Sequence, residues 1–101
     1  MKVHAILNRD GGTLKTTDLA VLSRLIEDEF RLHGHEIEVE VVAGQDVVGA
    51  IGGAGRREDI DVLLVGGGDG TVSCAAATLM DRRTALAILP AGTMNLFARS
   101  L

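Results

Sequence analysis

The sequence predicts an α/β protein with a parallel sheet of about four strands and helices on both faces. Four short apolar runs alternate along the chain with segments in which apolar residues recur at helical spacing. The connections between them are short, as in β-α-β units, whose helical crossovers join parallel strands. The last two apolar runs, residues 60–65 and 85–89, are apolar on both expected faces, which is typical of central parallel strands.

Residues 3–7 and 36–41 predict the first two strands. The first run ends at Asn8, directly before a turn with the sequence R-D-G-G. The second, E-I-E-V-E-V, alternates acidic and apolar residues, which indicates a half-exposed strand at or near an edge of the sheet. Its apolar side is expected to consist of Ile37, Val39 and Val41.

A helix is predicted after each of the four strands. The first follows Asp18, a residue suited to the start of a helix, and ends at Gly34. The second follows Asp46 and contains four glycines, each of which weakens a helix by about 1 kcal/mol relative to alanine. The third has a regular apolar repeat from Val72 onward, and the fourth follows Pro90. The inner face expected for the third helix comprises Val72, Ala75, Ala76, Leu79 and Met80.

One edge of the predicted sheet collects the glycine-rich connections. The alternating second strand favours the order 2-1-3-4, a Rossmann-like or flavodoxin-like three-layer arrangement with the first and third strands central. Ligands bind such sheets beyond the carboxyl ends of the strands, where the strand order reverses. Three connections lie at this edge. Residues 81–84 (D-R-R-T), which follow the third helix at the opposite edge, lack their glycine-rich and polar character. The three are residues 8–12 (N-R-D-G-G), 66–71 (G-G-G-D-G-T) and 90–95 (P-A-G-T-M-N), and their composition predicts a binding site.

The four glycines within residues 66–70 would bring backbone N–H groups close to a ligand, because glycine carries no Cβ. The helix that follows adds the positive end of its dipole, so together they predict a seat for phosphate. Asp69 would repel phosphate unless a cation bridges the two, and a functional Asp69 therefore implies Mg²⁺. The alternative is a tight strand-to-helix turn in which Asp69 or Thr71 only caps the helix.

Other polar residues at this edge are open to two interpretations. Asn8, Thr93 and Asn95 are suited to bind phosphate oxygens or a nucleotide base, and equally to cap helices or turns. The chain has no G-x-x-x-x-G-K-[ST] motif, and its glycines do not follow G-x-G-x-x-G after the first strand. The histidines show no metal-ligand spacing, and Cys74 is expected to be a small packing residue of the third helix.

The composition argues against several classes of function. The net charge is −4 and the basic residues are scattered, which disfavours a nucleic-acid partner. No apolar run reaches the ~20 residues of a membrane span or has the form of a signal peptide, so a soluble, cytoplasmic protein is expected. Cys74 is the only cysteine, so no internal disulfide can form. The lack of tyrosine and tryptophan disfavours a flavodoxin-type flavin site.

Three motifs together resemble the diacylglycerol kinase catalytic domain family, which includes bacterial lipid kinases and sphingosine kinases and is distantly related to NAD kinases. They are N-R-D-G-G at residues 8–12, G-G-D-G-T at 67–71 and P-A-G-T-M-N-L-F-A-R at 90–99, in the family's order and spacing. The second motif is shared with NAD kinases, whereas the third selects the lipid-kinase branch. The resemblance covers essentially the whole chain.

The resemblance implies an ATP site at the predicted edge. By match of motif, Asn8 and Gly12 border the nucleotide, and Thr93 and Asn95 close the site. Arg9 is placed to help neutralise phosphate charge. The residues expected to hold the phosphates are Gly67, Gly68, Asp69, Gly70 and Thr71, with Asp69 also the candidate contact to Mg²⁺ through the phosphates. Transfer of the γ-phosphate to a lipid hydroxyl then rests on positioning and on charge neutralisation by Mg²⁺.

The chain departs from the family pattern at four positions. The family usually shows N-P-x-[SA]-G in the first loop, where this chain has Arg9 in place of the proline and Gly11 in place of the small residue. Cys74 stands where a glutamate commonly follows G-G-D-G-T, and Leu96 stands where the family often has an aspartate. These changes bear on the metal and nucleotide contacts and not on the family.

Family enzymes carry a second, mostly β domain with the general base and much of the substrate pocket. Residues 1–101 are therefore expected to be the nucleotide-binding N-terminal domain of a lipid kinase-like protein, with the β-rich C-terminal domain absent and little or no kinase activity alone. A lipid would bind through that domain, with transient membrane contact by the full-length protein. The oligomeric state is open, because an exposed sheet edge could drive self-association. An NAD kinase-like phosphotransferase and a non-catalytic nucleotide-binding module are the two alternatives.

Overall fold

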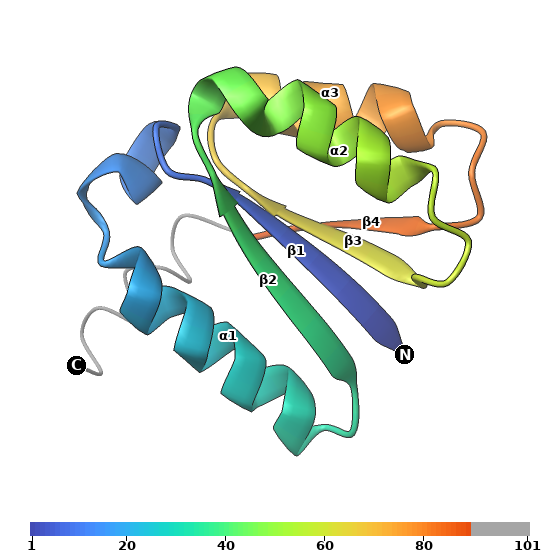
Figure 1. Ribbon diagram of the computed structural model, residues 1–101, viewed down its shortest axis with the longest axis horizontal. Coiled ribbons are helices and arrows are strands. Elements are labelled where there is room, and N and C mark those ends of the chain that lie inside the picture. The colour runs from blue at the N-terminus through green and yellow to red at the C-terminus, as the bar shows by residue number, and fades with distance from the viewer. Residues whose placement is uncertain (90–101) are drawn as a thin grey trace.

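The computed structural model describes residues 1–89 as a parallel four-stranded sheet between two layers of helices (Figure 1). The strands are β1 (Lys2–Asn8), β2 (Glu36–Val42), β3 (Val62–Gly66) and β4 (Ala85–Ile88). Their order across the sheet is β2-β1-β3-β4, and every neighbouring pair is parallel. The predicted α/β class and the strand order 2-1-3-4 are confirmed.

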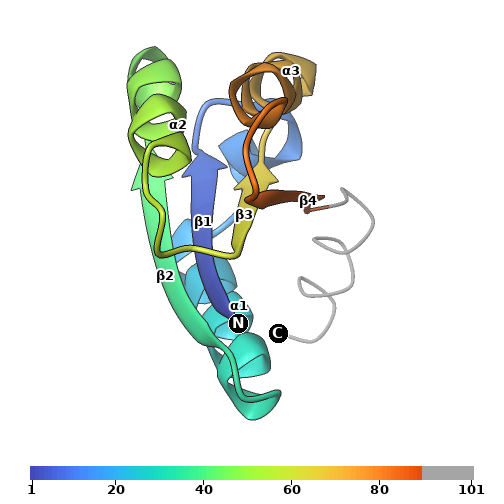
Figure 2. The ribbon, with the colours of Figure 1, turned by 90° about the vertical axis from the view of Figure 1, so that its right-hand side faces the viewer.

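The helices form two layers, one on each face of the sheet. α1 (Leu19–Leu32) covers one face, and α2 (Val47–Gly55) and α3 (Asp69–Leu79) lie side by side on the other (Figure 2). Two short 3-10 helices, η1 (Gly12–Thr16) and η2 (Gly44–Asp46), lie in the connections that follow β1 and β2. The expectation of helices on both faces is confirmed, and the helix predicted after strand four lies outside the described residues.

β1 is the central strand and contributes to the core on both faces of the sheet. Val3, Ala5 and Leu7 pack in the cluster beneath α1, whereas Ile6 packs in the cluster beneath α2 and α3. Ala5, Ile6 and Leu7 are fully buried. Because burial of apolar surface is the main stabilising term in folding, Asn8 at the end of β1 is held by a firmly packed strand.

Local sequence explains where α1 begins and ends. Asp18 precedes the helix, and its Oδ1 accepts a hydrogen bond from the backbone N–H of Val21 at 3.2 Å. Gly34 has a φ of +81° just after the helix, a left-handed conformation that favours glycine. The prediction that Asp46 starts the second helix, as Asp18 starts the first, is wrong in its detail. Asp46 precedes α2, but its side chain makes no capping hydrogen bond.

The buried face of α3 differs from the prediction. Thr71, Ala75 and Leu79 are buried, whereas Ala76 is exposed and Met80 is 77% exposed. The helix begins at Asp69, before the apolar repeat, and Thr71 turns inward, where its hydroxyl accepts a hydrogen bond from Asn8. The buried face of α3 therefore begins at Thr71, one position before Val72, where the apolar spacing predicted that it would begin.

β2 and β4 bury less than predicted. Val41 is 41% exposed, while Val42 packs on the other face beneath α2. Leu14 of η1 covers the carboxyl end of the sheet over β3, which leaves Val41 uncovered at the edge strand. In the part of the chain that the structure describes, β4 is also an edge strand, and Ile88 is 49% exposed, so the prediction that residues 85–89 are buried on both faces is wrong there.

Candidate functional site

Three connections meet at the carboxyl ends of β1, β2 and β3, the edge called the carboxyl rim here. The loop after β1 touches the loop after β3 by main chain, because a Cβ on Gly11 would lie 2.9 Å from the backbone nitrogen of Gly68. Real Cβ atoms do not approach a backbone atom so closely, so only glycine fits at position 11 without a shift. The family's usual serine or alanine would require these two loops to move apart.

Two glycines of the third connection are required by the chain's own packing. A Cβ on Gly66 would lie 2.9 Å from Leu7 Cδ2, so this residue permits close core packing at the end of β3, and its predicted role beside a ligand is not supported. Gly67 has a φ of +154°, and a Cβ there would lie 2.8 Å from Thr71 Oγ1. Both positions therefore exclude side chains for internal reasons.

The other two glycines of this connection face open space. The only atom within 4 Å of a Cβ on Gly68 would be the Gly12 nitrogen, at 3.9 Å, and a Cβ on Gly70 would meet nothing within that distance. Gly68 has an extended backbone conformation with a φ of −83°, which any residue adopts. Within residues 1–89, neither backbone conformation nor packing requires glycine at these two positions.

Asn8 links the first connection to the third. Its Nδ2 donates a hydrogen bond to Thr71 Oγ1 at 3.1 Å, and its Oδ1 accepts one from the backbone N–H of Asp10 at 3.0 Å. The residue before α3 is Gly68, and no side chain caps the helix there. Thr71 therefore serves as the acceptor for Asn8. The phosphate seat and the alternative of a purely structural turn both stay predictions.

The other predicted site residues that the structure describes, Gly12, Arg9 and Asp69, also lie at the carboxyl rim. Gly12 has a φ of +55° and begins η1, close to Gly67. Arg9 and Asp69 are exposed, and in the described part of the chain their side chains make no hydrogen bond or ion pair. Thr93 and Asn95 lie outside the described residues.

A hollow of about 240 Å³ opens between the starts of α2 and α3. Four predicted site residues, Asn8, Gly68, Gly70 and Thr71, line it together with Cys74, which also packs against the core beneath α3. Sequence reasoning missed the contribution of the connection after β2, which provides Gly44, Val47 and Val48. No motif marks those residues in the sequence.

The carboxyl rim does not hold a metal ion by protein side chains alone. Among residues 1–89, no group of three or more histidine, cysteine, aspartate or glutamate residues is arranged to bind one. Asp69 supplies a single carboxylate at the start of α3. A divalent cation here would take its remaining ligands from phosphate oxygens and water, as Mg²⁺ does at nucleotides.

The opposite edge of the sheet, called the amino rim here, has a different chemistry. Arg57 donates to both carboxylate oxygens of Asp59, at 2.9 and 2.7 Å, and to Glu38 at 3.2 Å. The Arg57 guanidinium, with Lys2 as a second donor, holds the pKa of Asp59 well below its ordinary value. The same guanidinium lowers the pKa of Glu38. His4 is buried among these charges, with its Nε2 3.1 Å from Glu40.

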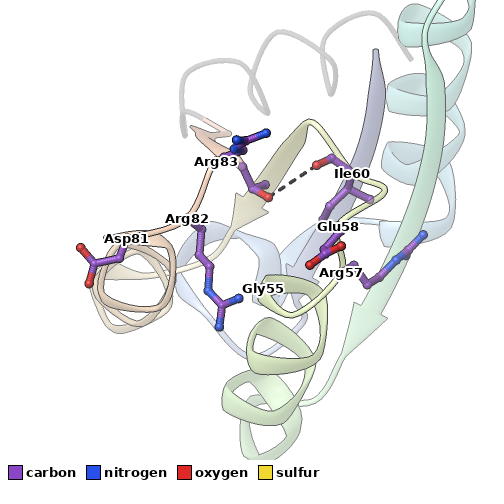
Figure 3. A pocket seen from close by; sticks show the side chains of 8 residues that line it. Gly55, Arg57, Glu58, Ile60, Asp81, Arg82 and Arg83 are labelled. Atoms are coloured by element: carbon purple, nitrogen blue, oxygen red, sulfur yellow. Dashed lines mark hydrogen bonds between the residues drawn. The ribbon is translucent and has the colours of Figure 1, made fainter.

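A larger hollow, of about 430 Å³, lies at the amino rim (Figure 3). Arg82 and Glu58 extend toward it, whereas Asp81 points away. α2 and α3 both end at this rim, and the negative end of each helix dipole favours cations such as Arg82. Among the described residues, neither a glycine-rich loop nor a helix N-terminus lines this hollow, so the size of a hollow does not identify the site.

Comparison with known families identifies the family of the chain. Residues 2–101 match the family model described as the diacylglycerol kinase catalytic domain. The chain belongs to the diacylglycerol kinase catalytic domain family. The resemblance seen in the three sequence motifs is thereby confirmed. Among the described residues of this kinase-family chain, none of the helices is both long and apolar enough to traverse a membrane.

A solved structure agrees with the family assignment. The chain is similar to the crystal structure of a candidate diacylglycerol kinase from Bacillus anthracis strain Sterne, with 26% sequence identity and a TM-score of 0.63. The similarity covers 88% of this chain and 31% of that protein. This chain therefore spans less than a third of the length of its structural relative.

Proposed function

We propose that this chain is the ATP-binding part of a lipid kinase that transfers the γ-phosphate of ATP to the hydroxyl of a diacylglycerol-like lipid. The observation that carries the proposal is the open space at Gly68 and Gly70. These glycines open α3, and the packing of the described chain does not require them. A bound phosphate would use that space and receive hydrogen bonds from the N–H groups of Asp69 and Gly70 in the first turn. The Thr71 N–H already donates to the Gly68 carbonyl at 3.1 Å.

The charged side chains at the carboxyl rim suit a nucleotide bound with Mg²⁺. When bound, Mg²⁺ would neutralise the phosphate charge that Asp69 alone would repel. Asp69 would face the cation, and Arg9, which is exposed beside the loop, would add positive charge near the phosphates. Asn8 and Thr71 would hold the loop in place, since their side chains are bonded to each other at 3.1 Å.

We propose that the lipid acceptor and the general base are bound and provided by a second domain. In the family a second domain holds the general base, and this chain spans only 31% of its structural relative. We therefore propose that the chain alone transfers no phosphate. In the full-length protein the lipid would bind through the second domain with transient membrane contact, in the cytoplasm and without a nucleic-acid partner.

Calorimetric titration of the chain with ATP and Mg²⁺ tests the nucleotide site. Gly68→Val is expected to fold, because the space beside Gly68 is open and its extended backbone suits valine. The substitution would fill the phosphate seat and lower the affinity by about 100-fold, or ~2.7 kcal/mol. Gly49→Val, at a helical glycine with equally open space, is the matched control and should bind as the parent does.

Two results would contradict the nucleotide site. The folded parent chain could bind no nucleotide at millimolar concentration, or Gly68→Val could bind as tightly as Gly49→Val. The kinase reaction needs the full-length protein, presented with diacylglycerol-like lipids and with NAD in parallel. Phosphate transfer to NAD and not to the lipids would favour the NAD kinase-like alternative.

A further inference from the structure

We propose that Asp10 is a positioning residue that fastens the connection after β2 to the loop after β1 and so holds the carboxyl rim in its binding shape. The inference rests on the proposed nucleotide site and adds a residue to which the family motif gives no role. Asp10 occupies the variable position of the first-loop motif. Its Oδ2 accepts a hydrogen bond from the backbone N–H of Gly44 at 2.7 Å.

The bond to Gly44 caps the helical segment formed by η2 and α2, which has no capping side chain of its own. η2 runs directly into α2, and neither Ala43 before η2 nor Asp46 before α2 provides a capping side-chain bond. α2 is also rich in glycine, which makes it intrinsically weak. The Asp10 carboxylate lies at the positive end of this segment and binds its first N–H, as a capping residue does, but from another part of the chain.

Arg9 explains why Asp10 reaches Gly44. The backbone N–H of Arg9 donates to the carbonyl of Val42 at 2.9 Å, which continues the pairing of β1 with β2 by one residue. The family's usual proline has no N–H and could not make this bond. The replacement of proline by arginine therefore brings the following residue alongside the connection after β2. The bonds Arg9–Val42 and Asp10–Gly44 are together called the latch.

The latch continues into the glycine loop. The backbone N–H of Asp10 donates to Asn8 Oδ1, and Asn8 Nδ2 donates to Thr71 Oγ1. Thr71 Oγ1 in turn lies 2.8 Å from the position that a Cβ on Gly67 would take. One run of contacts thus joins the connections after β1, β2 and β3, and Asp10 provides its hydrogen bond to Gly44.

The latch also affects where phosphate can bind. The hollow at the rim is bordered by the starts of α2 and α3, and a helix N-terminus attracts anions. The Asp10 carboxylate already occupies the amide at the start of η2. Its negative charge disfavours phosphate there and leaves the start of α3 as the favoured position.

Three substitutions test the inference with two measurements, hydrogen exchange of the Gly44 amide and Mg²⁺–ATP affinity. Asp10→Ala removes the acceptor, so exchange at Gly44 should accelerate by about tenfold and the affinity should fall by about fivefold to tenfold. Asp10→Asn keeps an acceptor oxygen and should stay within about twofold of the parent in both. Asp81→Ala, at an exposed carboxylate of the amino rim, removes the same charge and should change neither.

The outcomes separate the inference from the proposed function. Unchanged exchange at Gly44 in Asp10→Ala would overturn the latch, and so would a loss of affinity in Asp10→Ala without faster exchange, because Asp10 would then act on the nucleotide directly. If the parent chain binds no nucleotide, the proposed function fails. The exchange of Gly44 and the amide resonances of Gly67 and Gly68 in Asp10→Ala then still decide whether Asp10 holds the rim in shape.

Discussion

The two rims of the sheet use their polar residues differently. At the amino rim, Arg57, Asp59, Glu38 and Lys2 satisfy one another through ion pairs between side chains. At the carboxyl rim, Arg9 and Asp69 make no ion pair within the described residues. The loops there are joined by backbone contact, by the neutral bond of Asn8 with Thr71, and by the Asp10 carboxylate, which binds a backbone amide and not a side-chain cation. Charges that pair internally stabilise the fold weakly, whereas unpaired charges beside open backbone are available to a ligand.

Gly67→Ala tests this contrast with the largest expected effect. The substitution places a Cβ 2.8 Å from Thr71 Oγ1 at a φ of +154°, which alanine rarely adopts. The free energy of unfolding should fall by about 2–4 kcal/mol, measured by urea denaturation. A loss below about 1 kcal/mol would mean that the carboxyl rim adapts easily and is not fixed by its backbone contacts.

Thr71→Val tests the neutral bond at the carboxyl rim. Valine matches the shape of threonine but leaves the half-buried Nδ2 of Asn8 without its acceptor. The free energy of unfolding should fall by about 1 kcal/mol, and Mg²⁺–ATP affinity should fall with it. Thr71→Ser keeps the hydroxyl and is the control. Equal stability of the valine and serine variants would show that this bond does not hold the loop.

Gly70→Ala separates folding from ligand binding. A Cβ at this position meets no atom within 4 Å, and the residue lies in the first turn of α3. Alanine restricts the unfolded chain, so the free energy of unfolding should rise by about 0.5 kcal/mol. Nucleotide affinity should fall in the same variant, as titration can show. A variant that is less stable would indicate a structural need for Gly70 that the contacts do not reveal.

Arg57→Gln carries the smallest expected effect, because the ion pairs of the amino rim are exposed and screened by salt. Arg57 holds the pKa values of Asp59 and Glu38 below their ordinary values of 3.8 and 4.5. Carboxyls with a lowered folded-state pKa add stability above their ordinary pKa and lose it as the pH falls through the folded-state value. The parent should therefore lose this contribution below about pH 5, and Arg57→Gln should show a shallower loss.

Urea midpoints at pH 7, 5 and 3 measure that difference, at low salt and in 1 M NaCl. Arg82→Gln is the matched control, because in the described part of the chain Arg82 makes no ion pair through its side chain. If both arginine variants lose stability equally with acid, the paired charges of the amino rim do not behave differently from unpaired ones.

The sequence predicted the features that follow from apolar patterning. The alternation in residues 36–41 identified the edge strand and favoured the strand order that the structure has. The short connections predicted that the strands are parallel. The pattern failed where a single polar contact decides the geometry. Thr71 turned α3 so that Ala75 and Leu79, and not Met80, face the core, because its hydroxyl serves Asn8.

The site was predicted at the level of connections but not of contacts. The motifs predicted that the loops after β1 and β3 lie together, as they do in the structure. The glycine content of the loop after β3 predicted that it lies close to a ligand. The sequence could not separate Gly66, which packs against Leu7, from Gly68, which faces open space, because both are simply glycines. Nor could it pair Asp10 with Gly44, since a bond between distant loops leaves no periodic signal.

β1 pairs on its two sides with strands that lie at different distances along the chain. Its pairing with β2 begins at Lys2 and Glu36, and on its other side Val3 pairs with Val62 of β3. The second pairing closes the longer loop and therefore has the greater entropic cost. Asn8 and Thr71 can bond only when that pairing is made, so a ligand bound across the loops of the carboxyl rim stabilises chains in which both pairings of β1 are complete.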